Sequence, residues 1–402
     1  MRKLAPSGTP ISQRDLFLWA RSLFSRQTTL NRLAAEISKS FEIDQCFFFS
    51  TGRAAMVVLL ESLTEMAPTT KSTVVIPSYT CYSVPSSIIK AGLQINVCDI
   101  DEKTLDYDYD KLEQMDFSRV LAVVSSNLYG IPNDLDRLER LSEEKDLFLL
   151  DDAAQSMGAL SQTKRPAGTY GIAGLYSLDK GKVITSINGG IIVTRSSKLG
   201  AILQRKTRKI PPAPIPWCLV EILKMAIYSG FLSPRRYWIP AALPFVKLGI
   251  TEYTTDYPVS GYNTMLVGIA LSLFRQLEAI NDKSIANAAY YQENLPSSEH
   301  LRLIQPPPMS KPIYLRYPLR ITDNMRRKTI LALLEKSGLG ASGSYPGAIV
   351  DIYQLRDRLE IDGRDFRGGR RIAEQIVTLP THALVEKLDQ DRILNCIAKV
   401  LG

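Results

Sequence analysis

The sequence predicts an α/β fold, with a large domain built on a mostly parallel sheet between helices and a small α+β domain after it. Three observations support this. The chain has 402 residues, more than one ordinary domain holds. Its first half alternates short apolar runs with helical patterns, which is typical of a parallel sheet covered on both faces. Its last part mixes fewer strands with longer helices. We therefore expect a large domain over residues 1–280 and a small one over 281–402.

Short apolar runs predict the strands of the large domain, and helical patterns predict the segments between them. We expect strands at 46–50, 73–76, 93–98, 120–125, 147–150, 172–178 and 191–194. We expect helices at 28–38, 54–63, 84–91 and 135–145, and an amphipathic helix at 266–280 that leads out of the domain. In the small domain we expect strands at 314–321 and 376–379 and helices at 325–337 and 387–400.

Residues 203–258 form an unusual insert in the large domain. The insert holds several prolines and an apolar stretch, 217–232, whose only charges are Glu221 and Lys224. Because many prolines forbid one continuous helix, we expect two short helices with a turn. The favoured role is packing against a partner subunit or covering the active site. Contact with a membrane surface is the less favoured interpretation, since an interfacial helix should show a broad charged face.

Composition argues against several classes of protein. The formal charge is +8, but the basic residues are scattered in short groups without interleaved aromatics, so nucleic-acid binding is not expected. Five cysteines without ligand spacing and two histidines make a metal site improbable. The N-terminus shows no secretory signal, and no apolar run reaches the roughly 18–20 residues of a membrane span. We expect a cytoplasmic protein.

Polar residues follow several predicted strands, at the edge of the sheet where ligands of such folds bind. Gly52 and Arg53 lie between a strand and a helix, where free backbone N–H groups attract anions. Asp152 and Gln155 follow the run at 147–150. A carboxylate there can pair with a protonated pyridine nitrogen, although an Asp pair after a strand also serves as a turn or helix cap.

The loop between the last two strands carries the most informative residues, Ser177, Lys180, Lys182 and the pair Gly189-Gly190. A lysine in a tight loop between core strands can be desolvated, which lowers its pKa and leaves an amine able to attack an aldehyde. A serine five residues earlier can hold a phosphate. The combination suggests bound pyridoxal 5′-phosphate, with Lys182 forming the covalent bond. A surface loop with two solvated lysines is the alternative.

Ordered motifs from about residue 47 to residue 401 resemble the DegT-type family of pyridoxal-phosphate-dependent aminotransferases, which aminate sugars on nucleotide carriers. They are Ser50-Thr-Gly-Arg-Ala-Ala55, Pro77-Ser-Tyr-Thr80, Asp99-Ile-Asp101, Leu128-Tyr-Gly130, Asp152-Ala-Ala-Gln155, Ser177 with Lys182 and Gly189-Gly190, Gly261-Tyr-Asn263 and Leu379-Pro-Thr-His382. The resemblance implies fold type I, with a seven-stranded-type sheet in the large domain.

The resemblance also implies roles. Lys182 would bind the cofactor and move the proton, and Lys180 lacks the family's spacing from Ser177. Asp152 would bind the pyridine nitrogen, with Gln155 near the ring's phenolic oxygen. The phosphate would lie against Gly52, Arg53 and Ser177. Asn263 would reach the phosphate of a neighbouring subunit, which makes the protein a homodimer.

Several positions depart from the family pattern. Arg53 stands where a threonine is usual, and Asn188 where an acidic residue precedes the glycine pair. The family's ring-stacking aromatic residue is replaced by Cys81, with Tyr82 beside it. Thr264-Met265 replaces the end of an Asn-x-Arg motif. Tyr345 either lines the site entrance or belongs to a surface turn.

The sequence therefore predicts a pyridoxal-phosphate-dependent aminotransferase. Its amino donor would be an amino acid, with glutamate favoured, and its expected acceptor is a keto group of a nucleotide-linked sugar for surface polysaccharide. A branch of the family carries a histidine in place of the lysine and performs dehydration, and Lys182 argues against it. Another pyridoxal phosphate reaction on an amino acid-like substrate, or a cofactor-binding regulator without turnover, are the alternatives.

Overall fold

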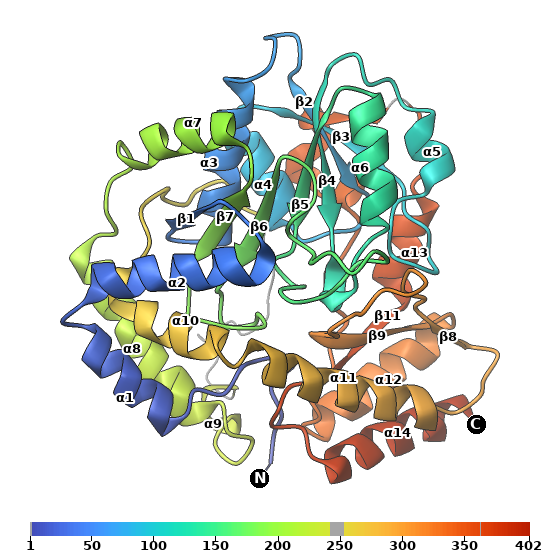
Figure 1. The fold of residues 1–402 in the computed structure, drawn as a ribbon. Helices are drawn as coiled ribbons and strands as arrows, with labels where there is room; N and C mark the ends of the chain where they lie inside the picture. Colours follow the sequence, from blue (N-terminus) through green and yellow to red (C-terminus); the bar gives the residue numbers. More distant parts are fainter. Residues whose placement is uncertain (1, 242–252, 362) are drawn as a thin grey trace.

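A computed structural model describes residues 2–241, 253–361 and 363–402 of the chain. Its main feature is an eight-stranded sheet in the order β1-β7-β6-β5-β4-β2-β3-β10 (Figure 1). The strands are β1 (Gln45–Phe49), β2 (Thr73–Pro77), β3 (Gln94–Cys98), β4 (Val120–Ser126), β5 (Phe148–Asp152), β6 (Ala173–Ser177), β7 (Gly190–Thr194) and β10 (Leu359–Glu360). β7 runs antiparallel to both neighbours, and β2 to β6 are parallel. The predicted α/β class and mostly parallel sheet are confirmed.

Helices cover both faces of this sheet, because successive side chains of a strand point to opposite sides. Leu149 and Ile191 join a core with α2 (Arg26–Phe41), α6 (Leu135–Glu144) and α10 (Val267–Phe274). Their neighbours Leu150 and Ile192 join a second core with α3 (Gly52–Thr64), α4 (Ser83–Lys90) and α7 (Ser197–Thr207). Strands buried on both faces are continuous apolar runs, which is why the sequence revealed them.

The C-terminal part has its own sheet and core. Strands β11 (Ile376–Pro380), β9 (Arg316–Ile321) and β8 (Leu301–Leu303) form an antiparallel sheet in that order. α11 (Leu277–Asn294), α12 (Asn324–Lys336) and α14 (Lys387–Leu401) bury their apolar sides with it. The boundary predicted at residue 280 falls inside α11.

Buried polar contacts tie this part to the large sheet. Asp99, at the end of β3, accepts hydrogen bonds at 3.0 Å from the N–H groups of Gly368 and Gly369 in α13 (Arg367–Gln375). It also accepts 2.8 Å and 2.9 Å bonds from Ser78 Oγ and Lys111 Nζ. A carboxylate at a helix N-terminus is favoured by the helix dipole. The small sheet is therefore fixed to the carboxyl end of the large one.

One helix prediction was wrong and another was confirmed in outline. The expected amphipathic helix at 266–280 is divided at Arg275-Gln276, and all of α10 is buried because it lies between α1 (Gln13–Ser22) and α2. In the insert, the expected pair of helices with a turn is found, although the first helix, α8 (Ile215–Phe231), is long rather than short. Its prolines precede or begin the helix, where a missing N–H costs nothing. The helix α9 (Trp238–Ala241) follows, and most of the second apolar run, 239–248, lies outside the described residues.

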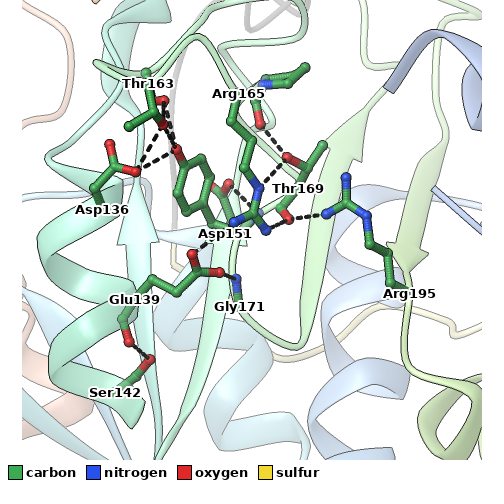
Figure 2. Close-up of polar contacts among 12 residues, drawn as sticks. Asp136, Glu139, Ser142, Asp151, Thr163, Arg165, Thr169, Gly171 and Arg195 are labelled. Carbon is green, nitrogen blue, oxygen red and sulfur yellow. Dashed lines mark hydrogen bonds and ion pairs between the residues drawn. The ribbon is translucent and has the colours of Figure 1, made fainter. Parts of the chain in front are cut away.

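A polar network fixes the connection from β5 to β6 (Figure 2). Arg165 donates a 2.7 Å bond to Glu139 of α6, and its guanidinium lies 4.0 Å from the centre of the Tyr170 ring. The Tyr170 hydroxyl donates at 2.9 Å to Asp136. These contacts hold the loop against α6 and leave the opposite, carboxyl end of the strands for a site.

Among the described helices, none combines the length and the apolar character needed to cross a bilayer.

Candidate active site

Strand pairing gathers the predicted site residues at one edge of the sheet. Gly190 of β7 lies opposite Ser177 of β6 on one side and Phe49 of β1 on the other. Asp152 of β5 lies opposite Leu175 of β6 on one side and opposite Ser126 of β4 on the other. The turn into α3, the lysine loop and the β5 carboxylate therefore share one edge, as the topology of a parallel sheet requires.

The first turn of α3 provides an anion site. Thr51 caps the helix by accepting a 3.0 Å bond from Ala54 N–H, so the N–H groups of Gly52 and Arg53 have no intrahelical acceptor. A Cβ atom at Gly52 would lie 3.4 Å from Ser177 Oγ, which places that hydroxyl beside the free N–H groups. The Oγ atom of Ser50 is buried without a partner among the described residues. Unsatisfied buried hydroxyls are rare, so a ligand atom there is expected.

Gly190 is the residue that permits this close approach. A Cβ atom at Gly190 would lie 2.3 Å from the Thr51 carbonyl oxygen, far inside contact distance. Only glycine lets β7 begin directly against the turn into α3. The Arg53 guanidinium lies 4.3 Å from the centre of the Tyr257 ring. The residue offers its backbone N–H to the anion site, and a contact of its side chain with a phosphate stays a prediction.

The structure distinguishes the two lysines of the loop. Lys180 is exposed, whereas Lys182 is half-buried and close enough to Asp152 for its charge to act on the carboxyl. The backbone around Lys182 is fixed from outside the loop, since Thr9 Oγ1 donates to the Lys182 carbonyl at 3.1 Å. The Tyr228 hydroxyl of α8 donates to the Lys180 carbonyl at 3.1 Å. These placements favour Lys182 as the reactive amine.

The adjacent carboxylates Asp151 and Asp152 have different surroundings. Asp151 is fully buried and accepts bonds from Asn127 Nδ2 at 2.7 Å, Gly168 N–H at 2.5 Å and Tyr170 N–H at 3.2 Å. Burial nevertheless raises the pKa of Asp151 to about 6. Asp152 accepts one bond, from Ala154 N–H at 3.0 Å. Burial raises the pKa of Asp152, and the Ala154 N–H and the Lys182 charge oppose that rise. Asp151 thus holds a loop, and Asp152 keeps acceptor capacity for a ligand.

Gln155 connects the β5 edge to a group of tyrosines. Its Nε2 donates a 2.8 Å bond to the Tyr345 hydroxyl, and its Oε1 accepts a 3.0 Å bond from Tyr129 N–H. The Tyr345 ring stacks on Tyr82 at 6.3 Å between centres. Cys81 lies at the same place, where its thiol adds to the rise in the pKa of Tyr345 that burial causes. Tyr345 is 9% exposed, so it is buried beside Gln155 and is not part of a surface turn, and its place in the site stays a prediction.

Arg316 at the start of β9 was not predicted from the sequence. Its Nη2 donates a 3.1 Å bond to Ser7 Oγ, and a Cβ atom at Gly181 would lie 3.2 Å from that same oxygen. Burial lowers the pKa of Arg316, and the surrounding hydroxyls, those of Tyr129 and Tyr345 among them, oppose that change. A guanidinium stays charged in proteins, so this cation lies beside the lysine loop with a hydroxyl as its hydrogen-bond partner. No local pattern marks it, because the small sheet brings it there.

Asn263 is not brought together with the other predicted residues. It is buried, its Nδ2 donates to the Cys218 carbonyl at 3.3 Å, and its Oδ1 accepts from Met265 N–H at 3.1 Å. Both ends of the amide are used within its own chain. The adjacent Tyr262 donates a 2.8 Å bond to Ser186 in the lysine loop. Contact of Asn263 with a neighbouring subunit stays a prediction, and in this structure the amide faces α8.

A cleft of about 860 Å³ opens elsewhere, beside the end of β3. Acidic and basic side chains line it together, among them Asp99, Lys111 and Arg320. Lys111 pairs with Asp99, and Arg320 pairs with Glu102. None of the predicted site residues lines this cleft. Because these charges are already paired, we place the active site at the sheet edge instead.

The residues at the sheet edge fit pyridoxal 5′-phosphate. The free N–H groups of α3 and the hydroxyls of Ser50 and Ser177 suit a phosphate. Asp152, with one hydrogen bond, suits a protonated ring nitrogen. Lys182 supplies an amine near that carboxyl. When bound, this cofactor supplies an electron sink for reactions at the carbon that carries an amino group.

Comparison with known proteins agrees with this reading of the site. L-glutamine:2-deoxy-scyllo-inosose aminotransferase of Micromonospora echinospora is 26% identical over 94% of this chain and 87% of its own length. GDP-4-keto-6-deoxy-D-mannose 3-dehydratase of Yersinia pseudotuberculosis is 30% identical, but the match covers 45% of this chain and 47% of that protein. The latter match thus spans about half of each protein.

Solved structures share the fold over the whole chain. Helicobacter pylori PseC, an aminotransferase involved in the biosynthesis of pseudoaminic acid, superposes with a TM-score of 0.80 at 16% identity and covers 100% of this chain and 99% of its own. The Escherichia coli GDP-4-keto-6-deoxy-D-mannose-3-dehydratase with bound hydrated PLP gives 0.78 at 17% identity, covering 100% of both chains.

A family model matches residues 20–209 and 245–398, which is most of the chain. The predicted family, its fold type I and its cofactor, pyridoxal 5′-phosphate, are confirmed. The chain belongs to the DegT/DnrJ/EryC1/StrS aminotransferase family.

Proposed function

We propose that this chain transfers an amino group from an amino acid to a keto group of a nucleotide-linked sugar, using pyridoxal 5′-phosphate. The observation that carries the proposal is the meeting of Lys182, the Asp152 carboxyl and the α3 anion site at one edge of the sheet. The M. echinospora relative is named for transfer from glutamine to an inosose, and GDP-perosamine synthase of Caulobacter vibrioides is 23% identical over 82% of this chain. We favour glutamate as donor and surface polysaccharide as the destination of the product.

Each residue has a defined task in this proposal. Lys182 Nζ binds the cofactor and moves the proton taken from the amino donor. Asp152 stays ionised and holds the ring nitrogen protonated, while the α3 N–H groups and Ser177 hold the phosphate. We assign the donor's carboxylate to Arg316, since its guanidinium lies beside the lysine loop and, among the described residues, bonds a hydroxyl and no carboxylate. Gln155 and Tyr345 close the side of the site that faces β2.

Dehydration of a keto sugar is the second candidate, because two dehydratases are among the relatives and neighbours. The two reactions leave different products. The purified holoenzyme would be incubated with nitrogen-15 glutamate and a panel of nucleotide-linked keto sugars, and the products read by mass spectrometry. We expect a product carrying the labelled nitrogen. Loss of water without label would establish dehydration instead, and no change in any sugar, with the cofactor bound, would favour a regulator.

The homodimer is part of the proposal and rests on the resemblance. Light scattering over a range of protein concentrations would test it directly. The role of Asn263 is tested separately with Asn263→Ala, since the amide is used inside its own chain here. If the dimer forms and the Asn263→Ala variant keeps the wild-type affinity for pyridoxal 5′-phosphate, the partner subunit contributes to the site through residues other than Asn263. We also expect the protein to act in the cytoplasm.

A further inference from the structure

The helix α8 has two faces with different surroundings. Its inner face packs on the protein and buries Cys218, Glu221 and Met225, which are spaced to share one side of a helix. Its outer face is exposed. The large apolar side chains that lie open here are Ile215, Leu219, Val220, Leu223 and Ile227 on α8, followed by Trp238 and Ile239 on α9. An apolar face of this size on a folded protein marks an interaction site.

Charges around this face are of one sign. Residues 208–241 contain a single acidic residue, Glu221, and it is fully buried. Its carboxylate accepts 2.8 Å bonds from Asn188 Nδ2 and from Lys224 Nζ, so it offers no charge to a partner. The four remaining basic residues of this segment are exposed: Arg208, Lys209, Arg235 and Arg236. The apolar face is thus flanked by exposed positive charge.

We propose that the outer face of α8, with α9 beside it, docks on the surface of an anionic lipid bilayer. The helix would lie along the interface with its apolar side chains among the acyl chains and the arginines at the headgroups. A second copy of the chain fits less well. In a twofold contact this face would meet itself, which would bring Arg235 and Arg236 near their own copies with no acidic residue of the segment to pair with them.

The sequence favoured a subunit contact because α8 lacks a broad charged face. An interfacial helix needs a broad charged face only when its second face lies in water. Here the second face packs on the lysine loop and on the N-terminal segment, since Glu221 bonds Asn188 and the Tyr228 hydroxyl accepts a 2.9 Å bond from Thr9 N–H. The protein itself takes the place of the charged face, and the objection no longer holds.

Sedimentation of the full-length holoenzyme with vesicles tests the proposal. The vesicles would be phosphatidylcholine with or without 30% phosphatidylglycerol, an amount chosen to give about the charge density of an anionic membrane. We expect binding to the anionic vesicles, weaker by at least about tenfold on neutral vesicles or at high salt. Leu219→Ser with Leu223→Ser and Ile227→Ser should reduce the binding by at least about tenfold, and Arg235→Glu with Arg236→Glu should do the same.

Met325→Ser with Leu388→Ser is the matched control, since both side chains are exposed hydrophobics on other helices. It should bind vesicles as the wild type does. Protein that stays in the supernatant with anionic vesicles overturns the proposal. So does binding that the serine and glutamate variants retain. If the wild type binds no vesicles and the triple-serine variant has half the wild-type mass by light scattering, the apolar face is instead a contact with a second copy of the chain.

Discussion

The carboxyl edge of the large sheet and the insert helix α8 both contact the lysine loop, but they do so in opposite ways. At the sheet edge, pairing between neighbouring strands fixes the place of each residue, as with Gly190 between Ser177 and Phe49. The insert touches the loop through single side chains, Glu221 and Tyr228, and turns its apolar face outward. The sheet edge therefore positions the candidate site residues. The insert supports the lysine loop and exposes an apolar surface.

The largest effect should come from the sheet edge, at Lys182. Lys182→Ala removes the amine that binds the cofactor and moves the proton, so turnover should fall by at least about 1,000-fold. Lys180→Ala, which alters an exposed lysine two residues away, is the control and should retain turnover. Borohydride reduction and peptide mapping should place the pyridoxyl group on Lys182. Modification at Lys180 would reverse the assignment.

The second prediction separates the adjacent carboxylates. Asp152→Asn keeps an acceptor for Ala154 N–H but loses the charge, so turnover should fall about 100-fold, roughly 3 kcal/mol, with little change in melting temperature. Asp151→Asn should instead lower stability by about 1–3 kcal/mol, because the new NH₂ group must face a donor, either Asn127 Nδ2 or the N–H groups of Gly168 and Tyr170. A turnover loss below about tenfold for Asp152→Asn would give its role to another residue.

The third prediction concerns His382, which lies where the small sheet meets the N-terminal segment. Its Nε2 lies 2.9 Å from the Ala5 carbonyl, and its Nδ1 accepts a 3.3 Å bond from Leu384 N–H, which defines the neutral ring. Burial lowers the pKa of His382 to about 4 from an ordinary 6.5. The unfolded chain therefore binds a proton between these pH values that the folded chain does not, and stability falls as the pH drops through that window.

The loss should reach roughly 2–3 kcal/mol between pH 6.5 and pH 4. Chemical denaturation of the wild type, His382→Gln and the control His300→Gln across that range measures it. The His382 variant should show a flatter pH dependence, and the control should follow the wild type. Equal slopes for all three proteins would mean that the loss of stability at low pH is set by carboxyl groups whose pKa is lowered in the folded protein, such as Asp99 and Asp389, and not by His382.

The two regions also differ in how far sequence could predict them. Every strand of the large domain followed from an apolar run, because burial on both faces leaves a local pattern. The two-residue strand β10 left none, since only its pairing with Ile95 and Asn96 defines it. Arg316 was missed for the same reason: the small sheet carries it to the site from far along the chain. Asn263 shows the reverse, a residue inside a matching motif whose amide faces α8 within its own chain, so that its predicted contact with a neighbouring subunit stays untested.

For α8, sequence identified the apolar stretch but not its division into an inner and an outer face. That division depends on Glu221 and Tyr228, whose partners Asn188 and Thr9 are distant in sequence. A polar residue in an apolar helix marks a place where the helix meets protein, because a buried carboxylate or hydroxyl needs a partner. The same principle predicts which substitutions in α8 affect turnover.

Tyr228→Phe removes a hydroxyl that accepts from Thr9 N–H at 2.9 Å and donates to the Lys180 carbonyl at 3.1 Å. We expect stability to fall by about 1 kcal/mol and turnover by about fivefold, since the loop that carries Lys182 loses one of its external supports. Leu223→Ser, five residues away on the outer face, is 60% exposed in the wild type and should change neither quantity in the absence of vesicles. Melting curves and turnover of the two variants, measured side by side, test whether the two faces of α8 have separate roles. Equal loss of turnover in both would show that α8 acts as one unit, and that its two faces do not have separate roles.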